Sequence, residues 1–95
     1  MKLFVDDIRD PPDQTWAVAR SSKVALEMCG SSWPSELALD HDLGGEDTVM
    51  VFLKGLHSMW DGTNPIPAWS VHSGNPVGRL NIVSFMTSWE KSSRE

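Results

Sequence analysis

Ionisable side chains gather at three points of the sequence, and each group directly follows a short apolar run. The groups are Asp6-Asp7 after Leu3-Phe4-Val5, Asp40-His41-Asp42 after Leu37-Ala38-Leu39, and His72-Ser73-Gly74-Asn75 after Trp69-Ser70-Val71. Short apolar runs of this kind are typical of strands buried in a parallel sheet. Because ligands of open α/β sheets bind beyond the carboxyl ends of the strands, we expect the three groups to meet in one site.

The carboxylates of this expected site suit a hard divalent cation. Asp6 and Asp7 are adjacent and repel each other unless a cation lies beside them, and Mg²⁺ or Mn²⁺ prefers such oxygen ligands. Asp40 ends its apolar run and is the better candidate for a metal ligand or a nucleophile, with Asp42 as a further ligand or a neighbour of one. The alternative is a solvated turn in which Arg9 pairs with the acids.

The imidazoles and the third group are suited to a phosphate. His41 and His72 can serve as base and acid in a phosphoryl transfer or hydrolysis, in an unassigned order, because imidazole titrates near neutrality. Ser73, Gly74 and the helix that Asn75 is expected to cap present a hydroxyl and free backbone N–H groups, which bind anions. The alternative gives Asn75 a capping role alone and makes the histidines hydrogen-bonded structural residues.

The spacing of apolar and capping residues predicts the remaining elements. Strands are expected over residues 2–5, 15–19, 36–39 and 68–71, the second at an edge of the sheet. Helices are expected from Ser21 or Ser22 to about Cys29 with Gly30 as terminator, from a cap at Asp47 to about Trp60, and from Asn75-Pro76 to a frayed tail at residues 91–95. This alternation predicts one α/β domain over residues 1–95, with a parallel sheet of about four strands flanked by helices.

Composition and charge argue against several classes of function. The 95 residues carry a formal net charge of −5 without any block of Lys or Arg, which argues against long nucleic acid as a ligand. The sequence has no signal peptide and no apolar run that could cross a bilayer, and its lone Cys29 cannot form an intramolecular disulfide. We therefore expect a cytoplasmic protein whose partner is a small phosphorylated ligand, with a metal to offset the acidic cluster.

Four segments together resemble the cyclic-phosphate processing receiver domains, a receiver-like family. They are LFVDDIRDPP at 3–12, WAVARSSKVAL at 16–26, LALDHDLG at 37–44 and VHSGNPVG at 71–78. The resemblance implies a truncated flavodoxin-like sheet in which Asp6 and Asp7 are the acidic metal-binding pair and Asp40 takes the phosphoacceptor position. It also implies that Ser73 is the hydroxyl residue that ends the fourth strand.

The resemblance also implies an activity. His41, His72 and Asn75 correspond to the residues that set this family apart from signalling receivers, and the family's proposed role is to process cyclic phosphates or related nucleotides, in RNA repair or in bacterial and phage conflict. Pro11-Pro12 stands where an ordinary receiver has its first helix, and the fifth strand with its following Lys is missing. These departures argue against phosphotransfer from a histidine kinase.

Two functions of different classes follow. The first is a metal-dependent phosphoesterase that hydrolyses or binds a small cyclic phosphate or nucleotide, with His41, His72 and Asp40 in catalysis. In it, the metal ligands are Asp6, Asp7, Asp40 and Asp42, and the substrate ligands are Arg9, Ser73, Gly74 and Asn75. The second is a non-enzymatic receiver-like module that binds a protein, for example an inhibitor of a host protein, which suits the small size, the acidity and the five tryptophans.

Overall fold

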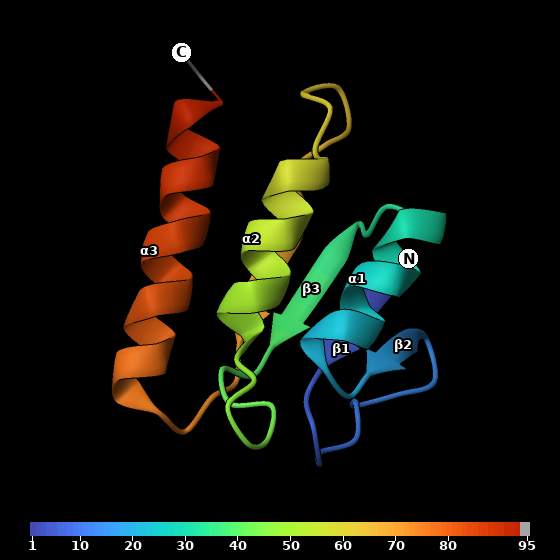
Figure 1. The fold of residues 1–95 in the computed structure, drawn as a ribbon. Coiled ribbons are helices and arrows are strands. Elements are labelled where there is room, and N and C mark those ends of the chain that lie inside the picture. The colour runs from blue at the N-terminus through green and yellow to red at the C-terminus, as the bar shows by residue number, and fades with distance from the viewer. Residues whose placement is uncertain (94–95) are drawn as a thin grey trace.

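The computed structural model describes residues 1–93, and its order of strands and helices is the one expected from the sequence (Figure 1). The elements are β1 (Lys2–Val5), β2 (Trp16–Ala19), α1 (Ser22–Ser31), β3 (Glu36–Leu39), α2 (Val49–Met59), β4 (Ala68–Val71) and α3 (Pro76–Ser92). The fold is an α/β receiver-like fold, consistent with a truncated flavodoxin-like domain.

The four strands form one parallel sheet in the order β2-β1-β3-β4. The prediction that the second strand lies at an edge is confirmed. Val5 pairs with Leu39, and Leu39 pairs with Val71, so the last residues of β1, β3 and β4 lie in one row across the sheet. The residue that follows each of these strands therefore reaches the same edge.

The three helices lie on the same side of the sheet (Figure 1). The connections through α1 and α2 step the same way across the sheet, and right-handed crossovers then place both helices on one face. The core forms between this face and the helices, and its members include Leu3, Val5, Leu37, Leu39, Phe52, Leu53, Leu56, Ile82, Met86 and Trp89. Cys29 lies among them as expected, and burial raises the pKa of its thiol to about 11.

The second face of the sheet has no helix within residues 1–93, because residues 6–15 join β1 to β2 without one. Phe4 points to this face, yet it is only 6% exposed. Its ring stacks on His72 at 4.7 Å between centroids and meets the edge of Trp16 at 6.3 Å. Aromatic side chains thus take over part of the shielding that a helix would supply.

Three predicted helix boundaries are wrong. The first helix continues past Gly30 to Ser31, because nothing there requires the left-handed backbone that favours glycine at a helix end. Residue Thr48, and not Asp47, occupies the N-cap of α2. The third helix extends through Lys91 to Ser92, so the predicted fraying is wrong for these residues, and residues 94–95 lie outside the described part.

Asp47 caps a different helix from the one predicted. Its carboxylate accepts the backbone N–H of Ser22 at 2.9 Å and the Ser22 hydroxyl at 2.5 Å, at the start of α1. Ser21 is the N-cap of that helix, as one of the two predicted alternatives has it. The loop that follows β3 is therefore tied to α1 by a capping interaction across the fold.

The tryptophans lie mainly at the borders of the core. Trp89 is buried, and Trp33, Trp60 and Trp69 pack against the core from partly buried positions. Trp16 packs on the second face with Phe4. No helix of the described residues is both long and apolar enough to span a membrane.

Replacement of Asp47 by Ala is expected to lower the free energy of unfolding by about 1–2 kcal/mol, because Ser22 loses both of its partners. Urea denaturation followed by tryptophan fluorescence measures the change. Glu46→Ala is the matched control, since Glu46 is an exposed neighbour in the same loop. Equal stability of the two variants would contradict the capping role.

Candidate functional site

The site begins as a row of polar residues directly beyond the strand ends. The backbone N–H of Asp40 donates to Val5 O at 3.0 Å, and that of His72 donates to Leu39 O at 3.0 Å, so the parallel ladder continues past the last strand residues. Asp6, Asp40 and His72 therefore lie in one row. The three polar groups expected to meet do come together here.

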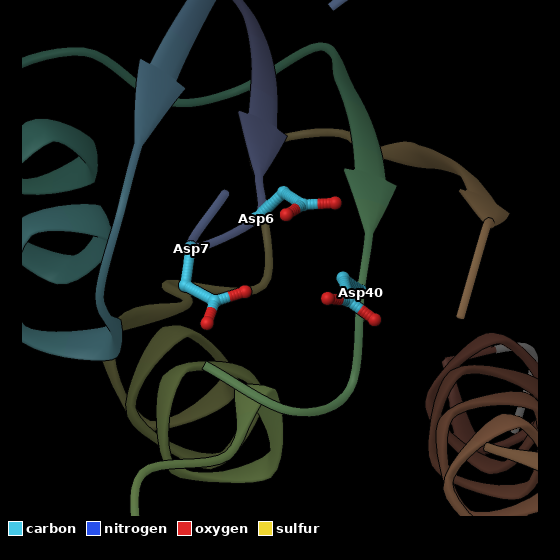
Figure 2. Close-up of side chains that lie close together, drawn as sticks. All are labelled: Asp6, Asp7 and Asp40. Atoms are coloured by element: carbon cyan, nitrogen blue, oxygen red, sulfur yellow. The ribbon is translucent and has the colours of Figure 1, made fainter. Parts of the chain in front are cut away.

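Asp6, Asp7 and Asp40 form a carboxylate cluster at the centre of this row (Figure 2). Each offers one oxygen, and the three oxygens lie within 4.8 Å of one another. Gly44, with φ of +92°, lies beside this cluster, and a side chain there would meet Asp7 Oδ2. Hard oxygen donors at this spacing fit a small divalent cation such as Mg²⁺ or Mn²⁺.

Asp6 is fully buried and strongly hydrogen-bonded. Its Oδ1 accepts the backbone N–H groups of Ile8 at 2.9 Å and Arg9 at 2.8 Å, and its Oδ2 lies 2.9 Å from His72 Nε2. Burial alone would raise the pKa of Asp6, but these hydrogen bonds outweigh it and hold the pKa below its usual range. Because an ionised carboxylate only accepts, the Nε2 atom of His72 carries the proton.

The pKa of Asp40 is shifted in the opposite direction from that of Asp6. Burial, and then the negative charge of Asp6, raise the pKa of Asp40 above its ordinary value, and its neighbours Ser73, His72 and Arg9 offset only part of this. The ionised form of Asp40 is therefore less favourable here than in water. This is the observation that favours a metal at the cluster, because the bound cation would remove the repulsion between Asp6 and Asp40.

A cleft of about 610 Å³ opens over the cluster. It is lined by Asp7, Ile8, Arg9, Asp40, Asp42, Ser73, Gly74, Asn75 and Pro76. All four predicted substrate-binding residues thus line it, together with three of the four predicted metal ligands. The fourth predicted metal ligand, Asp6, is buried and does not line the cleft. One of its oxygens nevertheless belongs to the carboxylate cluster.

The start of α3 shapes one wall of the cleft. Asn75 is the N-cap as predicted, and its Oδ1 accepts the Gly78 N–H at 3.1 Å. The Nδ2 of the same side chain donates to Asp42 at 3.2 Å, and the backbone N–H of Asn75 donates to Ser73 Oγ at 3.1 Å. Asn75 therefore caps the helix and also holds an acidic residue of the cleft in place.

Neither histidine lines the cleft. His72 stands behind Asp6, sandwiched between that carboxylate and the ring of Phe4. His41 is buried against α3, where its Nδ1 donates to Asp42 at 3.0 Å. The hydrogen bonds from His41 and Asn75 lower the pKa of Asp42. Each histidine is thus hydrogen-bonded to a carboxylate of the site. Such a bond fixes the orientation of a carboxylate that binds a metal.

Arg20 is a residue of the site that was not found from the sequence. Arg20 follows β2 and donates from its guanidinium to Asp6 O, Arg9 O and, at 2.9 Å, to Asp10. Gly78 packs so closely on His41 that a Cβ at this position would overlap the His41 ring. Arg20 shares the end-of-strand position of Asp6 and Asp40, which is the signal that could have identified it.

The parallel strand order β2-β1-β3-β4, with acidic residues beyond the strand ends, is that of a receiver-like domain. A family model for the cyclic-phosphate processing receiver domain matches residues 1–88, and the chain belongs to that family. The match associates the chain with the processing of cyclic phosphates. No curated protein and no solved structure matches it.

Gly78→Ala is expected to displace His41 and to lower the free energy of unfolding by about 1–3 kcal/mol, because the new methyl group has no space. Thermal unfolding and the imidazole NMR signals of His41 measure the two effects. Gly74→Ala serves as the control, since a Cβ there meets nothing within 4 Å. If both variants behave alike, the close packing of Gly78 on His41 does not matter for the fold.

Proposed function

We propose that the protein is a metal-dependent phosphoesterase that hydrolyses a small cyclic phosphate in the cleft beyond β1, β3 and β4. The observation that carries the proposal is the carboxylate cluster of Asp6, Asp7 and Asp40, in which one acid is already satisfied and Asp40 is held with a raised pKa. Membership of the cyclic-phosphate processing family supports the choice of substrate.

In this proposal Asp6, Asp7 and Asp40 hold Mg²⁺ or Mn²⁺, with Asp42 at the border of the cleft. The bound cation would neutralise charge on the phosphoryl oxygens and lower the pKa of water. The cleft needs such a cation, because its three lining carboxylates outnumber its one guanidinium, that of Arg9. Without it, a phosphate would be repelled.

The substrate phosphate is proposed to lie between Arg9 and the turn at Ser73 and Gly74. The Arg9 side chain is about half exposed at the cleft, although its Nη1 also donates to His72 O at 2.7 Å. Backbone N–H groups at this helix start that are not already bonded to Ser73 or Asn75 are the proposed donors to the phosphate. Water would attack phosphorus, the ring P–O bond would break, and the proton that the water loses would pass to the released oxygen.

The histidines act in this proposal through the carboxylates that they contact. His72 holds Asp6 in its ionised state and fixes its orientation, and His41 does the same for Asp42. To act directly as base and acid, in either order, both imidazoles would have to reach the cleft. Neither histidine lines it. We therefore propose His41 and His72 as positioning residues.

Metal binding tests the cluster directly. Titration with Mn²⁺, followed by isothermal calorimetry, is expected to show one saturable site in the wild type and its loss in Asp40→Asn. Affinity should fall as the pH is lowered, because a proton competes for Asp40, whose pKa is raised. Glu27→Gln is the control, since Glu27 is an exposed acid on α1, outside the site. Undiminished binding by Asp40→Asn would exclude this metal site.

Turnover tests the reaction. The protein with Mn²⁺ is incubated with 2′,3′-cyclic nucleotides, cyclic dinucleotides and ADP-ribose-type cyclic phosphates, and phosphorus NMR follows the products. His72→Ala is expected to lower kcat/KM by about 10- to 100-fold, because Asp6 loses the partner that orients it. His57→Ala, a change in the exposed histidine of α2, should leave it unchanged. No turnover of any compound by a metal-loaded wild type would refute the hydrolase.

A second candidate function is binding of a protein partner. Val77 and Leu80 are each 66% exposed on α3 and Val83 is 41% exposed, and together they give this helix an apolar outer side. In this case Leu80→Asp abolishes association with the partner, whereas the metal-site variants do not. The tryptophans carry less of such a surface than expected from the sequence, since Trp89 is buried and the others are partly so.

A further inference from the structure

Ile8 is the most exposed of the large apolar residues of the described chain, at 78%, and it lies in the wall of the cleft. A single exposed apolar side chain needs no explanation in itself. Ile8, however, follows the acidic pair of the site directly, and Pro76, at the start of α3, is a second apolar residue of the same cleft. The two give an otherwise polar site an apolar part.

The backbone of Ile8 is held firmly in place. Its N–H donates to Asp6 at 2.9 Å, and the next N–H, of Arg9, donates to the same oxygen. Arg9 reaches across to His72 O at 2.7 Å, and Arg20 donates to the backbone of Asp6 and Arg9. The chain here therefore has little freedom to fold the Ile8 side chain away from water.

The size of the cleft exceeds what a phosphate and a cation need. Its volume of about 610 Å³ lies within the range of roughly 300–1,000 Å³ that is usual for whole small-molecule ligands. Its polar residues can hold the phosphate end of such a ligand. Ile8 and Pro76 are the two lining residues whose side chains can make only apolar contacts.

We propose that Ile8 and Pro76 form an apolar lip that packs on a flat aromatic group of the ligand, so that the cleft prefers a phosphate that carries a nucleobase over a bare sugar phosphate. Ile8 is then a specificity-determining residue. The inference rests on the proposed function in one respect, namely that the phosphate end lies at Arg9 and the metal cluster. Burial of the aliphatic side chain against the base supplies the preference.

The test compares two probes of equal phosphate chemistry, AMP and ribose 5-phosphate, by calorimetric titration in saturating Mg²⁺. The wild type is expected to bind AMP about tenfold or more tightly than ribose 5-phosphate, since a partly buried Ile contributes about that factor. In Ile8→Ala this preference falls to about twofold or less, while the affinity for ribose 5-phosphate stays the same. Val51→Ala, at an exposed valine of α2, is the control.

Each other result overturns the inference. Equal binding of both probes by the wild type, a preference that survives in Ile8→Ala, and the absence of binding of either probe all exclude the lip. Failure of the proposed hydrolysis is a separate outcome, because it appears as preferential binding of AMP without turnover of any cyclic phosphate. The metal titration distinguishes a lost cluster from a lost lip, since Ile8→Ala should bind Mn²⁺ like the wild type.

Discussion

The site depends on one buried negative charge, the carboxylate of Asp6. A charged group without exposure to water is strongly unfavourable unless hydrogen bonds replace its hydration. Asp6 has these bonds, from the N–H groups of Ile8 and Arg9 and from the imidazole of His72. The donors come from the loop after β1 and from the end of β4. The hydrogen bonds to Asp6 thus fix the positions of two walls of the cleft.

The same constraint explains how the sheet tolerates the missing helix between β1 and β2. His72 covers Phe4 on the helix-free face while its Nε2 donates to Asp6. One side chain therefore shields an apolar ring and satisfies a buried charge. This double role also explains why His72 stands behind the cleft, where it is not free to meet a ligand. Arg20 holds the loop from the other side, so the loop stays ordered without a helix of its own.

The features that follow from local pattern could be predicted from the sequence. The four strands are short apolar runs with polar ends, and Asn75-Pro76 is a strong helix start, so both were predicted correctly. The meeting of the polar strand ends follows from a parallel sheet alone. Contacts between distant segments do not leave such a pattern. Asp47 satisfies the capping rule beside α2, yet the fold places it at α1.

The histidines show the same limit. Spacing places His41 between two acids at the end of a strand, which suggested a residue that faces the ligand. Its actual orientation depends on Gly78, whose lack of a side chain leaves a space for the ring beneath α3. That space exists only once α3 has packed against the sheet. A residue type beside a site is thus predictable, whereas the direction of its side chain requires the packed structure.

The two central carboxylates differ in a way that links stability to function. Asp6 contributes stability that is lost as the pH falls through its lowered pKa, whereas Asp40, with a raised pKa, makes folding less favourable as the pH rises and it ionises. The fold thus has an unfavourable charge beside a satisfied one. A divalent cation would relieve that repulsion, and its binding to the folded state alone would stabilise the protein. Ionised Asp40 is therefore the member of the cluster that is unfavourable for the fold, as is typical of a site selected for a ligand.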